Sequence, residues 1–189
     1  VARTSFDAGS ASYGSEAFVS NPDRVLVVRL TASVGGALTF AIRFESQLRQ
    51  QVVTTSEGDL LLSGRAPVQA LPNYVRDAKD PVVYEAGPEG RGMRFAARAR
   101  ILRTDGRIER GPSSVSVHGA HEALLDVAVE TSFAGFDQEP ARGPDPVPAT
   151  LARLRAVVSR SYRTLREGHV HYFRALFDRV SLDLGDAGR

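Results

Sequence analysis

The clearest strand pattern in this chain is Leu38-Thr-Phe-Ala-Ile-Arg-Phe44. Its Leu, Ile and two Phe residues alternate with Thr, Ala and Arg, so a period of two places the four large apolar side chains on one face. The pattern therefore predicts a strand with one buried face. Ser33-Val-Gly-Gly36 precedes it. Because glycine accepts positive φ, this stretch predicts a hairpin turn that joins the strand to another over Val25–Ala32.

Further strand patterns lie on both sides of this pair. They follow one another at short intervals, without helical patterns between them, at Val1–Phe6, Tyr13–Val19, Asp59–Ser63, Val82–Glu85, Met93–Leu102, Ser114–His118 and Ala123–Thr131. Within Met93–Leu102, five apolar residues fall on one register, and four arginines lie on the opposite register or just beyond it; the five are Met93, Phe95, Ala97, Ala99 and Ile101. This series predicts a mainly β chain that forms a large antiparallel sandwich.

The last part of the chain changes to helical spacing. Apolar residues recur every three or four positions from Leu151 to Val180, and arginines occupy much of the opposite side. Pro148 suits a first helical turn, with Asp145 or Thr150 as a cap, and Gly168 is the expected point of interruption. We expect four parts: a sandwich over 1–135 that is incomplete at its N-terminus, a Pro-rich linker over 136–148, a helical linker over 149–180, and a terminal stub over 181–189 that opens with a short strand.

Composition narrows the classes of partner. The net charge is +2, and 23 of the 24 basic residues are arginines spread singly along the chain, which argues for solvated charges and against a nucleic-acid surface. No apolar run approaches the roughly 20 residues of a membrane span. The absence of cysteine excludes disulfides and thiolate metal sites. It leaves the compartment open, with a secreted or periplasmic location favoured and a GC-rich bacterial source expected.

The histidines do not have the spacing of a metal site. His118 and His121 flank a turn, while His169 and His171 lie two apart on a predicted helix and point in different directions. We therefore expect surface or capping histidines, no metal and no cofactor.

Two longer stretches, Glu16–Leu30 and His169–Gly185, resemble the N-terminal region of family 95 glycoside hydrolases, the bacterial α-L-fucosidases. Three shorter segments resemble the same family in the same order, so the resemblance covers nearly the whole chain. They are Gly64-Arg-Ala-Pro67, Pro72-Asn-Tyr-Val75 and Thr131-Ser-Phe-Ala-Gly-Phe-Asp137.

The resemblance implies a β-supersandwich followed by helical linkers that lead to an (α/α)6 catalytic barrel. The family's usual opening, a Trp-containing strand region with a Gly-Asn-Gly-Arg-Leu-Gly-type segment, has no match here. The barrel, which carries the family's acid and water-activating residues, is also absent from the sequence. The resemblance therefore implies no catalytic residue in this chain and an inactive domain when the chain is alone. Its expected partners are the barrel and, through the full-length enzyme, fucosylated glycans.

Two groups of residues are candidates for functional contacts. The first is a Pro-containing loop that faces the barrel or lies near a sugar, with amide, aromatic and guanidinium groups at Arg65, Asn73, Tyr74 and Arg76. The second is an apolar helical stripe for a domain interface or self-association, at Phe173, Leu176, Phe177 and Val180. We expect the stripe either to fold back onto the sandwich or to be buried against a neighbouring copy.

Two alternatives to a family 95 supporting domain stay open. One is a stand-alone carbohydrate-binding module, although the chain lacks the tryptophans that usually form sugar platforms. The other is the same domain of a related inverting hydrolase or phosphorylase.

Overall fold

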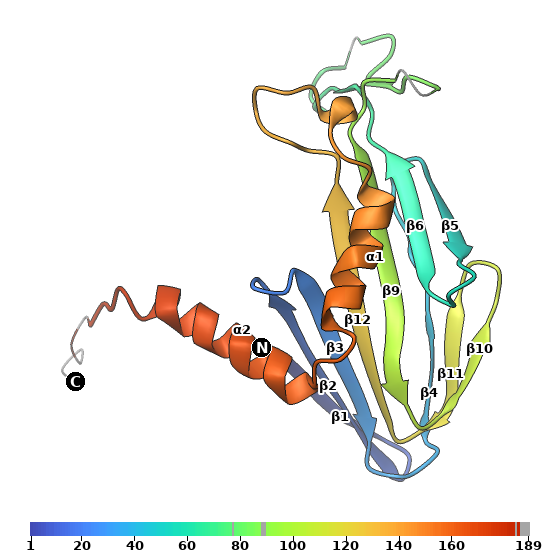
Figure 1. Ribbon diagram of the computed structural model, residues 1–189, viewed down its shortest axis with the longest axis vertical. Helices are drawn as coiled ribbons and strands as arrows, with labels where there is room; N and C mark the ends of the chain where they lie inside the picture. The colour runs from blue at the N-terminus through green and yellow to red at the C-terminus, as the bar shows by residue number, and fades with distance from the viewer. Residues whose placement is uncertain (77, 88–89, 184, 186–189) are drawn as a thin grey trace.

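The computed structural model describes residues 1–76, 78–87, 90–183 and 185, and its largest element is a seven-stranded sheet (Figure 1). All neighbouring strands in this sheet are antiparallel. Their spatial order is β1 (Ala2–Ala8), β2 (Ala11–Ser20), β3 (Val25–Ala32), β12 (Glu122–Thr131), β9 (Arg94–Thr104), β6 (Leu60–Arg65) and β5 (Gln50–Thr54). The expected mainly β, antiparallel fold with a C-terminal helical region is confirmed.

Each face of the large sheet is covered by a different layer. One face packs against a three-stranded sheet, and the other packs against two helices (Figure 1). The small sheet has the order β10 (Arg107–Arg110), β11 (Val115–Ala120) and β4 (Leu38–Ile42). The helices are α1 (Pro146–Val157), which lies on β12 and β9, and α2 (Tyr162–Phe177), which begins on β2.

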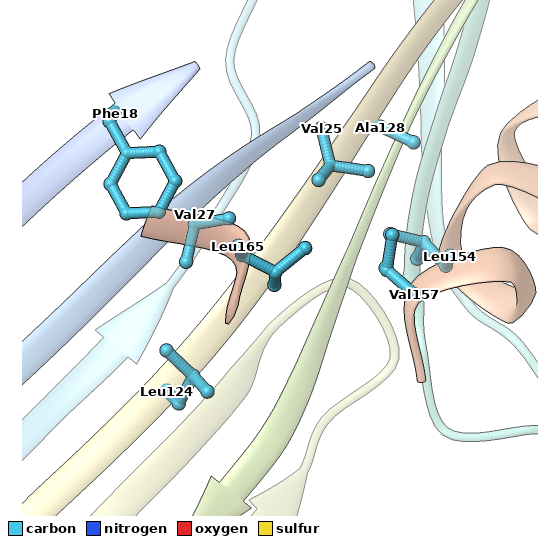
Figure 2. Close-up of a cluster of buried hydrophobic side chains, with 8 residues drawn as sticks. All are labelled: Phe18, Val25, Val27, Leu124, Ala128, Leu154, Val157 and Leu165. Atoms are coloured by element: carbon cyan, nitrogen blue, oxygen red, sulfur yellow. The ribbon is translucent and has the colours of Figure 1, made fainter. Parts of the chain in front are cut away.

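Alternation along β12 separates the two cores. Leu125 packs with residues of the small sheet, whereas Leu124 and Ala128 face the helices. Side chains from three strands and both helices form the core on the helix side (Figure 2). Its buried members are Phe18, Val25, Val27, Leu124, Ala128, Leu154, Val157 and Leu165.

The predicted hairpin between the strands at Val25–Ala32 and Leu38–Phe44 is wrong. Strand β3 is flanked by β2 and β12 and has no free edge, so β4 pairs with β11 in the other layer. The turn at 33–36, with Gly36 at φ +79°, therefore carries the chain from one sheet to the other. The buried face of Leu38–Ile42 is as predicted, because Leu38, Phe40 and Ile42 pack in the core between the sheets.

Three strands were not predicted, because they are short or polar. They are β5, β10 and β7 (Gln69–Ala70), the last of which forms a two-stranded sheet with β8 (Val82–Val83).

The helical region begins earlier than expected. A 3-10 turn, η1 (Pro140–Arg142), and the first turn of α1 both lie within residues 136–148. Asp145 is the N-cap of α1 and accepts a hydrogen bond from the Val147 N–H at 3.0 Å, as one of the two expected capping residues.

The expected interruption at Gly168 is wrong. Helix α2 runs through Gly168, and the helices are separated at residues 158–161, where Ser161 caps α2 through the Thr164 N–H. Residues 180–183 form no strand, and the rest of the predicted strand and most of the stub lie outside the described residues.

Candidate functional site

Arg65 is the last residue of β6, and its guanidinium holds a neighbouring loop. Its Nη1 donates hydrogen bonds to the carbonyls of Gly87 and Gly90, both at 2.8 Å. A β-carbon on the preceding Gly64 would lie 2.5 Å from the Arg49 carbonyl oxygen, so only glycine fits there. Arg65 therefore has a structural role in addition to any ligand contact.

The other three loop candidates lie apart from Arg65. Asn73 and Tyr74 occupy a turn closed by the Val75 N–H, which donates to the Pro72 carbonyl at 3.0 Å. These side chains and that of Arg76 are exposed, and no hydrogen bond in the described part of the chain joins them to Arg65. The structure thus places Arg65 at the end of β6 and the other three candidates on the loop that follows β7, and the cavity lined by Arg65 does not include them.

The two halves of α2 have different surroundings. Its first half packs on the sheet, where Leu165 is fully buried and the Tyr162 hydroxyl donates to Glu16 Oε2 at 2.6 Å. Its second half projects away from the sheet (Figure 1). The four stripe residues identified in the sequence are between 46% and 82% exposed, so they do not fold back onto the sandwich: Phe173, Leu176, Phe177 and Val180.

An aromatic ladder connects this exposed end to the core. The ring of Phe18 lies 5.0 Å from His169, which lies 6.2 Å from Phe173, and Phe173 stacks on Phe177 at 5.2 Å. The three helical members are four residues apart, which places them on one side of α2. His169 is half-buried, and this partial burial lowers its pKa.

A buried ion cluster was missed by the sequence analysis. The Asp59 carboxylate is 1% exposed and accepts hydrogen bonds from Arg100 Nε and Nη2, both at 2.7 Å, and from Arg98 Nη1 at 3.3 Å. Arg98 Nε also lies 3.4 Å from the Thr150 hydroxyl, so the cluster joins β9 to α1. The sequence signal was the shared register of Arg98 and Arg100, opposite the apolar residues of the same strand.

Asp126 is a second buried acid on the helix-facing side of β12. Its Oδ1 has no hydrogen-bond partner in the described residues. Burial raises the pKa of Asp126 to about 6, and the positive charge of Arg100 opposes this rise.

The strands of the chain match the profile of a known protein family. The profile of glycosyl hydrolase family 65, N-terminal domain, matches residues 1–135, which contain all twelve strands. The chain belongs to this family. As a glycosyl hydrolase N-terminal domain, it combines the sandwich of the family match with two helices that lie beyond the matched residues.

A curated relative points to the same class of protein. This N-terminal domain is 28% identical over 190 residues to "Alpha-L-fucosidase 2" of Arabidopsis thaliana. The match covers 97% of this chain but 22% of the relative, so the chain spans about a fifth of the relative's length. The chain is thus an N-terminal domain of a glycoside hydrolase that is similar to an α-L-fucosidase.

The described residues of this glycosyl hydrolase domain contain neither a candidate metal site nor a helix suited to span a membrane. No group of three or more His, Asp or Glu residues is placed to hold a metal ion. Among the helices that the structure describes, none has the length and apolar character to span a membrane.

Proposed function

We propose that this chain is the N-terminal domain of an α-L-fucosidase-like enzyme of glycoside hydrolase family 95, where it packs against and supports an (α/α)6 catalytic barrel. The collinear segments that resemble family 95 support this assignment, as does the similarity to a plant α-L-fucosidase over nearly the whole chain. In the proposed enzyme, fucosylated glycans are substrates of the complete protein and not ligands of this domain alone.

The observation that carries the proposal is the exposed second half of α2. The first half of α2 packs on β2. In its second half, the side chains of Phe173, Leu176 and Phe177 remain exposed to solvent. Burying each such side chain is worth about 1.5–3 kcal/mol. Since most of the fucosidase relative lies outside the aligned region, a following domain is the natural cover for this surface.

The two buried carboxylates, Asp59 and Asp126, do not form a hydrolytic pair. Inverting glycosidases need two carboxyl groups about 6.5–9.5 Å apart, with a water molecule and the scissile bond between them. Asp59 is neutralised by Arg98 and Arg100, and Asp126 is buried beneath the helices, so a sugar reaches neither of these acids. We therefore expect the 189-residue chain to be inactive by itself.

The test compares the chain with the complete protein encoded by its gene. We expect the complete protein to hydrolyse a chromogenic α-L-fucoside and the 189-residue chain to show no turnover. In the complete protein, Phe177→Glu should lower the melting temperature, and the control His171→Glu, at an exposed polar position of the same helix, should not.

Two results would contradict the proposal. One is fucoside turnover by the chain alone that a single substitution in it abolishes. The other is a complete protein without fucosidase activity whose stability is insensitive to Phe177→Glu. Binding of a neutral fucosylated oligosaccharide to the chain alone would favour the carbohydrate-binding module instead.

A further inference from the structure

An open cavity of about 440 Å³ lies between the ends of three strands of the large sheet and the N-terminus of α1. Residues from β5, β6 and β9 line it on one side, and Asp145 to Val147 line it on the other. Its volume lies within the roughly 300–1,000 Å³ range of ligand sites. Three of its side chains are arginines from separate segments, namely Arg49, Arg65 and Arg94.

Neutral groups hold these three guanidiniums in place. Arg49 lies over the Tyr84 ring at 4.3 Å, Arg65 donates to two loop carbonyls, and Arg94 Nη2 donates to the Gly143 carbonyl at 2.7 Å. None of the three forms a salt bridge with a carboxylate among the described residues. Three positive charges thus line one opening. Among the described residues, Asp145 is the acid that shares this lining, and Glu85 lies near enough to Arg65 for that charge to help lower the pKa of Glu85.

Two groups of the lining bear on the balance of donors and acceptors in the cavity. Arg94 Nε is buried and has no hydrogen-bond partner in the described part of the chain, which is costly for a donor. The carboxylate of Asp145 also lines the cavity, but it accepts the capping hydrogen bond from the Val147 N–H. The described lining therefore carries three arginines against one carboxylate, which gives it a positive net charge.

We propose that this cavity binds the oxyanion of an acidic saccharide, either the carboxylate of a uronic acid or a sulfate ester. Guanidinium groups bind such oxyanions through two parallel hydrogen bonds, which lysines do not provide. Gln50, Gln51 and Ser63 also line the cavity, and amide and hydroxyl side chains of these types can donate to and accept from sugar hydroxyls.

The two parts of this proposal have different supports. The anion follows from the arginines of the cavity, and the saccharide follows from membership of a glycosyl hydrolase family. Neither part depends on fucosidase activity or on the catalytic barrel, so failure of this proposal leaves the proposed function intact, and the reverse also holds.

The test is a titration of the 189-residue chain followed by ¹H–¹⁵N NMR. The probes are trigalacturonate with its methyl ester, and galactose 6-sulfate with galactose. We expect at least one acidic probe to shift the amide signals of Gln51, Ser63 and Arg94, to bind at least tenfold more tightly than its neutral counterpart, and to bind more weakly as salt is raised. The acidic probe that binds identifies the oxyanion.

Arg49→Gln is the decisive variant, because the Arg49 side chain is exposed and makes no carbonyl contact. We expect about tenfold weaker binding of the acidic probe, corresponding to the loss of one charge-assisted contact. The control Arg107→Gln removes an exposed charge from the small sheet and should leave binding unchanged. The NMR spectrum of each variant shows whether its fold is intact. Equal binding of acidic and neutral probes, shifts outside the cavity, no binding, or an unaffected Arg49→Gln variant would each overturn the proposal.

Discussion

At the residue scale, the single buried carboxylate of Asp59 holds two arginine side chains in place. It is the shared acceptor of Arg98 and Arg100, and the side chain of Arg98 is 6% exposed. Removing the negative charge leaves this guanidinium buried with only a distant partner, Glu57, at 3.8 Å. The cluster therefore makes the position of α1 on β9 depend on one charge.

We expect Asp59→Asn to reduce the free energy of unfolding by about 3 kcal/mol, near the lower end for a broken buried ion pair. Urea unfolding followed by circular dichroism measures this change. The control Glu109→Gln alters an exposed ion pair and should change stability by less than about 1 kcal/mol. Similar stabilities for both variants would show that the buried cluster has no special weight.

Asp126 makes stability depend on pH in a defined direction. Its pKa rises from an ordinary value of 3.8 to about 6 in the folded chain. The unfolded chain therefore loses this proton first, so the contribution of Asp126 to stability is full below pH 3.8 and is lost as the pH rises through about 6.

Asp126→Asn removes this dependence. Relative to the original chain, we expect the variant to gain stability between about pH 4 and pH 7, by up to roughly 3 kcal/mol. Urea unfolding at several pH values measures the difference. A constant difference across this range would contradict the prediction.

Asp105→Asn is the matched control with the opposite sign. The backbone N–H groups of Glu122 and His121 donate to Asp105 Oδ1 and lower its pKa. Its contribution to stability is therefore present at neutral pH and lost as the pH falls through this lowered value. The variant should be less stable than the original chain at neutral pH, and the two should converge in acid.

At the scale of elements, helix α2 contains Gly168 at a position where neither the packing nor the backbone conformation requires a glycine. A β-carbon added to Gly168 would meet no heavy atom within 4 Å, and the residue has ordinary helical φ. We expect Gly168→Ala to raise the free energy of unfolding by about 0.5–1 kcal/mol, because alanine loses less backbone freedom on folding. Thermal unfolding checks this value. Gly119→Ala, at a residue with φ +67°, should instead destabilise the chain.

The sequence predicted which face of a strand is buried better than it predicted which strand that strand pairs with. Alternation in Leu38–Phe44 correctly identified the buried side of β4, because a period of two depends only on local geometry. It could not identify β11 as the pairing strand, since that choice depends on which sheet edge is free. The helical spacing after residue 148 likewise predicted a helical region. It did not predict the break between α1 and α2, because that break depends on the cap at Ser161.

The candidate sites were predictable only where they are local. The exposed loop with Tyr74 and the apolar stripe with Phe173 follow from composition and spacing within one segment. The cationic cavity joins Arg49, Arg94 and the start of α1, which lie far apart in the chain. No local pattern connects these residues, because their proximity results from the order of β5, β6 and β9 in the sheet.

At the scale of the whole molecule, the isolated chain presents an uncovered apolar surface. The second half of α2 extends from the sheet with Phe173, Leu176 and Phe177 in solvent. We expect copies of the isolated chain to associate through this surface, so the radius of gyration from solution scattering should rise with concentration. Phe173→Glu should reduce this rise, whereas His171→Glu should not. A strictly monomeric chain at all concentrations would contradict the expectation.

The central position of β12 has a consequence for how the chain reaches this fold. It is the last strand in sequence, yet it lies between β3 and β9 and is hydrogen-bonded to both. If the earlier strands pair first, they form two half-sheets, β1–β2–β3 and β9–β6–β5, and we expect their inner edges to stay unpaired until β12 is added. Pairings over such long sequence separations give a high contact order and slow folding. Nascent chains that end before β12 are therefore the species most exposed to misassembly.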